Sequence, residues 1–261
     1  MAGPILLAET VDGVATIRLN RPDVHNAFDD ALIAELTGAL RAVAAAADIR
    51  AVVLAATGKS FSAGADLTWM RRMAGASIAE NEADARALAE LMRTLHDLAK
   101  PTVAVVQGPA YGGGVGLVAA CDIAIAAETA TFALSEVRLG LIPAVVSPYV
   151  VAAIGARVAR RYFLTGERFG AAEALRLGLV HLVAGAARLD EALRGVLAAL
   201  AEGGPVAQAA AKRLVADVAG RPIDAALAAE TARCIADIRA GAEAKEGIAA
   251  FLDKRKPAWR R

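Results

Sequence analysis

The sequence predicts an α/β protein in which a body of strands and helices is followed by a helical region. Short apolar segments of strand-like composition, as at 50–56 and 102–106, alternate with segments of helical periodicity in the first half of the chain. Glycine-rich turns follow two of the strand-like segments. After Pro143 the apolar residues recur at helical spacing almost throughout.

The elements follow in order along the chain. Residues 14–19 alternate partly between apolar and polar and predict a strand, paired across the Asp12-Gly13 turn with a strand near 5–10. A helix is expected over 29–47, with Asp29 and Asp30 suited to its start. The other expected elements are a buried strand at 50–56, a helix at 78–99 stopped by Pro101, strands at 102–106, 122–126 and 131–134, a short helix ending at Ala120, and a possible strand near 179–183.

Composition excludes several classes of protein. Of the 261 residues 57% are hydrophobic, but much of this is alanine, the best helix former, which favours a helix-rich chain over a membrane protein. The uncharged stretches 101–121 and 139–156 are interrupted by prolines, the first also by glycines, and do not predict spanning helices. The first residues lack a targeting pattern, so we expect a cytoplasmic protein.

Charge and the numbers of cysteine and histidine also limit the kinds of partner and ligand that we expect. A net charge of +1 with 4% aromatic residues predicts neither nucleic acid nor a membrane as a partner. Two cysteines are too few for a disulfide framework, and the three histidines are scattered, so no metal is expected.

Three familiar site signatures are incomplete. Gly58-Lys59-Ser60 resembles the end of a phosphate-binding loop, but Val53 stands where that loop needs its first glycine. Residues 112–117 lack the last glycine of a dinucleotide fingerprint, and residues 58–62 lack the last glycine of a nucleophile elbow. The sequence therefore gives no support for an NTPase, a dehydrogenase or a serine hydrolase.

Two glycine-rich turns remain, at 61–66 and 112–114. Each follows a strand and opens a helix, and their small residues let a ligand approach the main chain. Amides at a helix start are unpaired and lie at the positive end of the helix dipole. Two such amides that meet at one oxygen form an oxyanion hole. The alternative is that both are ordinary tight turns.

Four blocks of residues together resemble the enoyl-CoA hydratase/isomerase (crotonase) family. They are Ser62-Ala63-Gly64-Ala65-Asp66, then 107–114 from Gln107 to Gly114, then Cys121-Asp122-Ile123-Ala124, and then 135–143 from Ser135 to Pro143. The similarity extends from Arg21-Pro22 and Asn26-Ala27 to residues 251–256, and so covers essentially the whole chain. The resemblance implies a crotonase-like spiral of ββα units with a helical C-terminal trimerisation region, assembled as a homo-trimer or hexamer.

The resemblance also implies roles for residues. Residues 1–195 would form the core that carries the coenzyme A (CoA) and oxyanion site, and 196–261 a helical region for oligomerisation and CoA contact. Ala65 and Gly113 would supply the oxyanion N–H groups, and Lys254 would lie near the CoA phosphates, although residues 254–256 alone read as a solvated basic tail. The CoA path would be lined by His25, Ala27, Ala63, Ala65, Asp66 and Leu67.

Glu136 is the candidate for proton transfer. Hydration of an enoyl thioester needs a base that activates water, an acid that protonates Cα, and a polarised carbonyl. Glu136 matches the second of the two glutamates that hydratases of the family use, and its apolar neighbours favour a desolvated carboxyl. The alternative is an exposed glutamate at a strand end. At the position of the first glutamate stands Gly116, which puts the two-carboxylate mechanism in doubt.

The leading interpretation is an enoyl-CoA hydratase acting on a short branched or carboxylated 2-enoyl-CoA such as 3-methylglutaconyl-CoA. Residues 63–73, 114–116 and 141–149 look like the bacterial methylglutaconyl-CoA hydratase branch. The acyl pocket would then contain Trp69, Arg71, Arg72, Ala144 and Phe251, with at least one arginine binding the second carboxylate; surface arginines are the alternative.

Other functions remain open on the sequence. Gly116 is also consistent with a Δ3,Δ2-enoyl-CoA isomerase that uses Glu136 as its sole proton shuttle. An RNA-binding protein and a catalytically inactive acyl-CoA scaffold are the other readings. No cofactor is expected for the enzyme, because CoA is part of its acyl-CoA thioester substrate.

Overall fold

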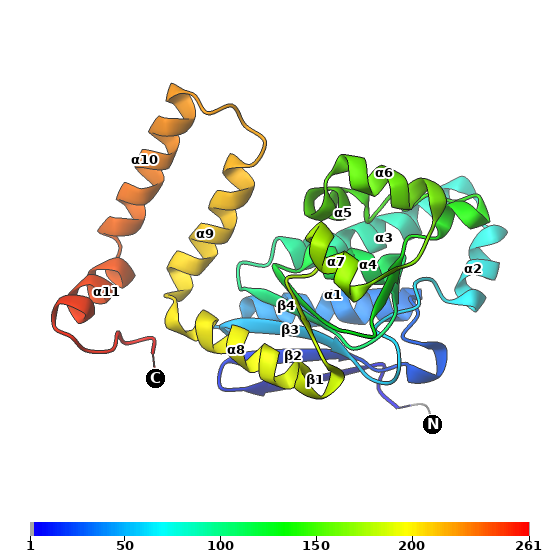
Figure 1. Cartoon of the computed structure of the whole chain (residues 1–261), viewed down its shortest axis with the longest axis horizontal. Coiled ribbons are helices and arrows are strands. Elements are labelled where there is room, and N and C mark those ends of the chain that lie inside the picture. Colours follow the sequence, from blue (N-terminus) through cyan, green and yellow to red (C-terminus); the bar gives the residue numbers. More distant parts are fainter. Residues whose placement is uncertain (1–2, 261) are drawn as a thin grey trace. The chain divides into compact units, whose positions relative to one another are not determined.

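The computed structural model describes residues 3–260, so the outermost residues of the two expected regions, 1–2 and 261, lie outside the described residues. The chain forms two compact units (Figure 1). Residues 1–98 and 102–194 form the first unit, and residues 99–101 and 195–261 form the second. The sequence placed its boundary after residue 195, and the roles expected for the two regions stay predictions.

A six-stranded sheet is the centre of the first unit. Its strands lie in the order β1 (Leu6–Val11), β2 (Val14–Leu19), β3 (Ala51–Ala56), β4 (Thr102–Val106), β6 (Ile123–Ala127) and β9 (Leu182–Ala184). β1 and β2 pair antiparallel across the tight turn, and all other neighbours are parallel. β3 and β4 are buried almost end to end, as expected for parallel strands covered on both faces.

A second sheet of three short strands lies beside the turns that carry the candidate site. Its order is β5 (Ala110–Tyr111), β7 (Thr131–Ala133) and β8 (Phe169–Gly170). β4 and β6 join the large sheet, while β5 and β7, which follow them in the chain, join the small one. The chain thus passes from the large sheet to the small one twice, from β4 to β5 and from β6 to β7. After β5 it leads into a helix.

Helices pack against one another and against the large sheet in the first unit (Figure 1). The pairs in contact include α1 with α3, α3 with α4, and α4 with α5. These helices are α1 (Asp30–Ala45), α2 (Leu67–Ala74), α3 (Ile78–His96), α4 (Gly113–Ala120), α5 (Ser147–Ile154), α6 (Ala156–Thr165) and α7 (Ala171–Leu177). The largest fully buried side chains are Phe61, Phe132, Ile17, Leu19, Leu32, Leu36, Leu40, Leu54, Leu91, Met92, Leu95 and Leu117.

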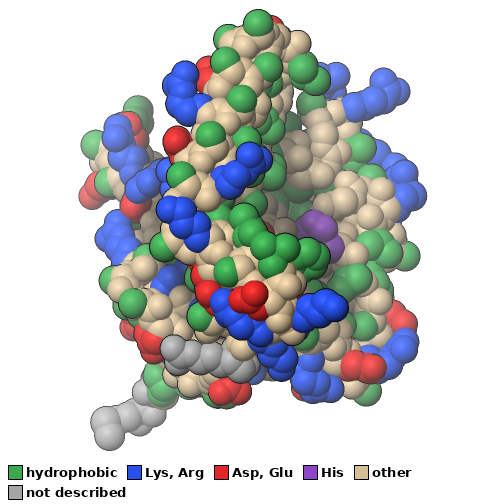
Figure 2. Space-filling model, turned by 90° about the vertical axis from the view of Figure 1, so that its left-hand side faces the viewer, with side chains coloured by type: hydrophobic (Ala, Val, Ile, Leu, Met, Phe, Trp, Pro, Cys, Tyr) green, Lys and Arg blue, Asp and Glu red, His purple; other side chains and the backbone are tan. Residues whose placement is uncertain are grey.

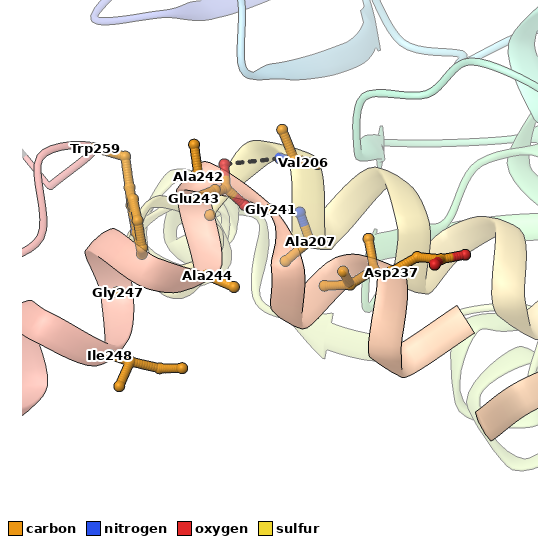
Figure 3. Close-up of a pocket in the computed structure, with 12 residues that line it drawn as sticks. Val206, Ala207, Asp237, Gly241, Ala242, Glu243, Ala244, Gly247, Ile248 and Trp259 are labelled. Atoms are coloured by element: carbon orange, nitrogen blue, oxygen red, sulfur yellow. Dashed lines mark hydrogen bonds between the residues drawn. The ribbon is translucent and has the colours of Figure 1, made fainter. Parts of the chain in front are cut away.

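The second unit is helical. α8 (Leu189–Glu202) leads into it from the first unit, and α9 (Pro205–Val218), α10 (Ala225–Ala240) and α11 (Ala242–Leu252) pack on one another. An open pocket of about 440 Å³ lies among these three helices. Figure 3 shows the residues that line it, Trp259 among them. The Glu243 carboxylate at its edge accepts the backbone N–H groups of Val206 and Ala207 and so caps α9. None of the residues named for the site from the sequence lines this pocket.

The surface is mixed in character. Figure 2 shows cationic, acidic and apolar side chains interspersed on one face of the molecule, in keeping with the net charge of +1. Among the described residues, no helix combines the length and the apolar character needed to cross a membrane.

Most elements expected from the sequence are confirmed with shifts of a few residues. The helix expected at 78–99 ends at His96, and the strand expected near 179–183 is Leu182–Ala184. The strands β5 and β8 were not predicted, because two residues are too short to show a periodic pattern.

Candidate active site

The first glycine-rich turn leaves a single amide without a partner. Of four successive N–H groups, Ala63 donates to the His25 carbonyl at 2.9 Å, Gly64 to the Ser62 hydroxyl at 3.3 Å, and Asp66 to the Phe28 carbonyl at 2.8 Å. The N–H of Ala65 between them has no hydrogen-bond acceptor within residues 3–260. Ala65 is also exposed, so this donor is accessible to a ligand.

The second turn is built in the same way. Tyr111 donates its N–H to the Ser62 carbonyl and Gly112 donates to the Ala133 carbonyl, both at 2.9 Å. Gly113 is the first residue of α4, where no preceding turn of helix offers a carbonyl, and its N–H has no acceptor among the described residues. Gly112 has a φ of +49°, a conformation that glycine adopts far more readily than other residues.

The two turns lie against each other. Ser62 and Ala110 form an isolated parallel bridge, which aligns the segments that lead into the turns. A Cβ atom on Gly64 would lie 3.1 Å from the Tyr111 carbonyl oxygen, and one on Gly112 would lie 3.8 Å from the Gly64 Cα. A side chain at position 64 would therefore press against the second turn, and the close approach brings the two amides that lack an acceptor among the described residues into one region.

Glu136 lies beside this pair of turns. It is the first residue of a short 3₁₀ helix, Glu136–Leu139, and its Oε1 would be 3.0 Å from a Cβ on Gly112. Its Oε2 is buried and has no hydrogen-bond partner among the described groups. Burial raises the pKa of Glu136 above its ordinary value of 4.5, because desolvation disfavours the charged form. Of the apolar neighbours of Glu136 in the sequence, Phe132 and Leu134 are buried, whereas Val137 is exposed.

These groups can carry out a defined kind of chemistry. Two N–H donors without acceptors are suited to an oxygen that becomes negative during a reaction, and a carboxyl with a raised pKa is suited to accept and return a proton. A carbonyl compound that exchanges a proton next to the carbonyl needs both.

The raised pKa predicts the pH dependence of the reaction. If Glu136 is the proton acceptor expected from the sequence, its ionised form is the active one, so kcat/KM should fall, with unit slope, as the pH is lowered through a pKa above 4.5. For the hydration expected from the sequence, the measurement is the initial rate of loss of the enoyl absorbance across a pH series. A rate that stays constant down to pH 4.5 would contradict the desolvated state of this carboxyl.

The residues expected along the CoA path are found in two settings. His25, Ala63 and Leu67 are exposed near the first turn, and the His25 Nδ1 lies 3.0 Å from the Ser60 hydroxyl. Ala27 is buried, so its side chain presents little surface to a ligand. The Asp66 carboxylate caps α2 by accepting the N–H groups of Thr68 and Trp69. Their roles in CoA binding stay predictions.

The residues expected in the acyl pocket differ in their exposure and in their contacts. The Trp69 indole donates to Asp84 at 3.0 Å, and Ala144 is exposed in the segment before α5. The Arg72 guanidinium lies 3.2 Å from the carboxylate of Asp30, whereas Arg71 is exposed and forms no ion pair with a described residue. Of the two arginines, Arg71 is therefore the one without an ion pair in the described part of the chain.

Two of the predicted residues belong to the second unit. Phe251 is 82% exposed near the end of α11, and Lys254 follows it with a φ of +56°. Their predicted contacts with the acyl group and the CoA phosphates stay predictions.

The place of the missing first glutamate is filled. A Cβ atom on Gly116 would lie 2.2 Å from the Val146 Cγ1 and 3.2 Å from the Met92 Cε. Gly116 is in α4 and Val146 is the residue just before α5, so the glycine lets these two helices pack closely. The sequence showed that a carboxylate is absent, but it did not show that a side chain from another element occupies the space.

Asn26 has a structural role that the sequence did not reveal. It is fully buried, its side-chain oxygen accepts the Arg21 N–H at 2.7 Å, and its amide donates to the carbonyls of Thr57 and Ser60 at 2.8 Å. Asn26 also has a φ of +54°, a left-handed backbone conformation that asparagine tolerates better than most residues. Asn26 thus connects the segment before α1 to the loop after β3.

Known proteins match this chain over nearly its whole length. The family model for Enoyl-CoA hydratase/isomerase matches residues 9–261. A Thermus thermophilus protein assigned as an enoyl-CoA hydratase is 36% identical over 94% of this chain and 96% of its own length.

Solved structures are similar over nearly the whole chain. An enoyl-CoA hydratase from Shewanella pealeana has a TM-score of 0.96 and 45% identity, covering 98% of this chain and 96% of that one. A Legionella pneumophila protein assigned to the enoyl-CoA hydratase/isomerase (crotonase) family has a TM-score of 0.93 and 45% identity, covering 98% of both chains. The crotonase-like fold expected from the sequence is confirmed.

Proposed function

Because the chain belongs to the enoyl-CoA hydratase/isomerase family, we propose that it hydrates a short branched or carboxylated 2-enoyl-CoA such as 3-methylglutaconyl-CoA, with Glu136 as the proton-transfer group. The relatives named as enoyl-CoA hydratases confirm the prediction of an enzyme of this type. The acyl group and the roles of the residues are our proposal.

The observation that carries the proposal is the buried Oε2 of Glu136, which has no hydrogen-bond partner within residues 3–260. Glu136 lies beside two amides that also lack a partner in that range. A buried polar atom without a hydrogen bond destabilises a folded protein. Such an atom therefore indicates a place where a ligand supplies the missing hydrogen bond. A thioester oxygen would accept the N–H groups of Ala65 and Gly113. Water or the carbon next to the carbonyl would face the carboxyl.

One carboxyl is sufficient for the proposed reaction. The ionised Glu136 takes a proton from water while the hydroxyl adds to Cβ, and electron density moves to the thioester oxygen held by the two amides. The enolate then collapses and Cα takes the proton from Glu136, which returns to its ionised form. The raised pKa suits both steps, since the carboxyl must accept and release a proton in each cycle.

The reaction is tested with a set of enoyl-CoA esters that includes crotonyl-CoA, 3-methylglutaconyl-CoA and a 3-enoyl-CoA. Hydration removes the conjugated enoyl absorbance and places one solvent deuterium on Cα. We expect the highest kcat/KM with the branched, carboxylated substrate. If no 2-enoyl ester loses its absorbance, the hydratase proposal is wrong.

The substrate carboxylate gives a second prediction, for Arg71. A charge-assisted hydrogen bond contributes about 1.5–3 kcal/mol, so Arg71→Gln should lower kcat/KM for 3-methylglutaconyl-CoA roughly 10- to 100-fold. Crotonyl-CoA, which has no second carboxylate, should be affected less than about 2-fold. Arg72→Gln is the matched control, because Arg72 is paired with Asp30. An unchanged preference in both variants would mean that neither arginine selects the substrate.

A Δ3,Δ2-enoyl-CoA isomerase is the second candidate, and the packing of Val146 against Gly116 favours it. With that space filled, one carboxyl serves the site, and one carboxyl is enough to move a proton between two carbons. The same set of substrates distinguishes the two reactions, since isomerisation of the 3-enoyl ester creates the conjugated absorbance that hydration removes.

We also propose that the enzyme works as a homo-trimer or hexamer, without a cofactor beyond the CoA of its substrate. Support comes from the second unit, where several large apolar side chains are exposed, among them Val206, Val215, Ile235, Phe251 and Leu252. Sedimentation or light scattering of the purified protein measures the oligomeric state.

A further inference from the structure

Arg21 lies between two aspartates that each begin a helix. Its Nη2 is 2.7 Å from Oδ2 of Asp29 and 3.5 Å from Oδ2 of Asp66, and its Nη1 donates to the Ala27 carbonyl at 2.6 Å. The arginine side chain is 17% exposed, and the two aspartate side chains are 21% and 12% exposed. Salt screens such partly buried pairs less than surface pairs, and the planar guanidinium fixes their geometry.

In both aspartates one carboxylate oxygen caps a helix and the other lies next to Arg21. Oδ1 of Asp29 accepts the Leu32 N–H at 2.9 Å and caps α1. Oδ1 of Asp66 accepts the Thr68 and Trp69 N–H groups and caps α2. In each aspartate Oδ2 is the oxygen that lies next to Arg21, so the guanidinium links the N-termini of two helices.

This link extends to the amide of Ala65. Phe28 donates its N–H to the Gly64 carbonyl at 2.7 Å and accepts the Asp66 N–H at 2.8 Å, so the two hydrogen bonds lie on either side of residue 65. Arg21 holds both segments of this bridge, one through the Ala27 carbonyl and the other through the Asp66 carboxylate. The direction of the Ala65 N–H therefore depends on where the guanidinium holds them.

We infer that Arg21 is a positioning residue, which aims the Ala65 amide at the thioester oxygen without touching the substrate. The inference rests on the proposed function, because it concerns the same oxyanion hole. An oxyanion donor acts only when it lies about 2.7–3.1 Å from the developing charge, so a small displacement of residues 64–66 removes its effect. A lysine at position 21 would keep the charge, but a single ammonium cannot reproduce the fork that reaches three acceptors.

The test compares Arg21→Lys with the wild type by infrared spectroscopy. The probe is butyryl-CoA labelled with ¹³C at the carbonyl, a saturated ester that has no double bond to hydrate. Two donors in the oxyanion hole lower the stretching frequency of this carbonyl on binding. We expect Arg21→Lys to lose at least about half of that shift, with kcat reduced roughly 10- to 100-fold and KM changed less than about 3-fold.

Two control variants separate positioning from general destabilisation. Arg161→Lys makes the same chemical change in a forked arginine pair with Glu167 at the surface. Ile17→Val removes one methyl group from the buried strand β2 and lowers the urea midpoint while leaving the first turn intact. Both should keep the carbonyl shift and the kcat of the wild type.

A second variant gives an answer even if Arg21→Lys does not fold. Asp66→Asn retains a side-chain oxygen to cap α2, because asparagine caps as well as aspartate, but it loses the charge next to Arg21. We expect it to reduce the carbonyl shift and kcat in the same direction. A full shift and a wild-type kcat in Arg21→Lys, or in Asp66→Asn where the first does not fold, would overturn the inference. A wild type without any carbonyl shift would instead overturn the oxyanion hole of the proposed function.

Discussion

Replacing Glu136 with glutamine is expected to abolish most of the turnover while the enzyme still binds its CoA ester. General acid–base catalysis by a single side chain typically contributes about 10²- to 10⁴-fold, and here one carboxyl serves both proton transfers, so kcat should fall by at least about 10³-fold. Glutamine has the same shape, so KM should stay within about 3-fold. Steady-state rates of loss of the enoyl absorbance give both constants.

Glu35→Gln is the matched control for this substitution. Glu35 is exposed in α1 and takes no part in the site, so the same chemical change there should leave kcat unaltered. The urea midpoint of Glu136→Gln should equal or exceed that of the wild type, since the substitution removes a carboxyl whose ionised form is disfavoured by burial. Turnover retained by Glu136→Gln would assign the proton chemistry to another group.

Substitution of Gly116 is expected to have the largest effect on stability. A Cβ at this position would lie 2.2 Å from the Val146 Cγ1 and 2.8 Å from its Cβ, far inside van der Waals contact. Gly116→Ala should therefore destabilise the protein by about 1–3 kcal/mol, although alanine is the better helix former. Gly116→Glu should cost more than that and add no activity, because its carboxylate has no space. Urea unfolding followed by circular dichroism measures the change.

Gly38→Ala provides the matched control, with the opposite sign. Gly38 is also inside a helix, α1, but a Cβ there has no atom within 4 Å. This substitution should stabilise the protein by about 0.5–1 kcal/mol through helix propensity alone. The double variant Gly116→Ala with Val146→Ala should be less destabilised than the sum of its parts, because the shortest of the clashes, with the Val146 Cγ1, is removed. Equal effects at positions 38 and 116 would refute the close packing of α4 on α5.

The resemblance and the local pattern were enough to propose most of the candidate site. Each amide of the proposed oxyanion pair follows a strand and leads into a helix, a local arrangement that a short stretch of sequence specifies. Glu136 could be proposed as the proton-transfer group from a local pattern as well, since it lies in the block 135–143 that resembles the family. The helix starts at Asp29 and Ser77 are likewise local, as a side chain there caps amides within three residues.

Only the tertiary structure decided which side chains have a partner and which space a distant side chain fills. Arg71 and Arg72 are neighbours of the same type, yet among the described residues only Arg72 has an ion-pair partner, because Asp30 of another helix lies beside it. Gly116 could not reveal Val146, thirty residues away in the chain, as the occupant of its space. In the same way, Arg21 carried no sign that it links Asp29 with Asp66. Sequence patterns report contacts between near neighbours, while these interactions join distant segments and exist only once the chain has folded.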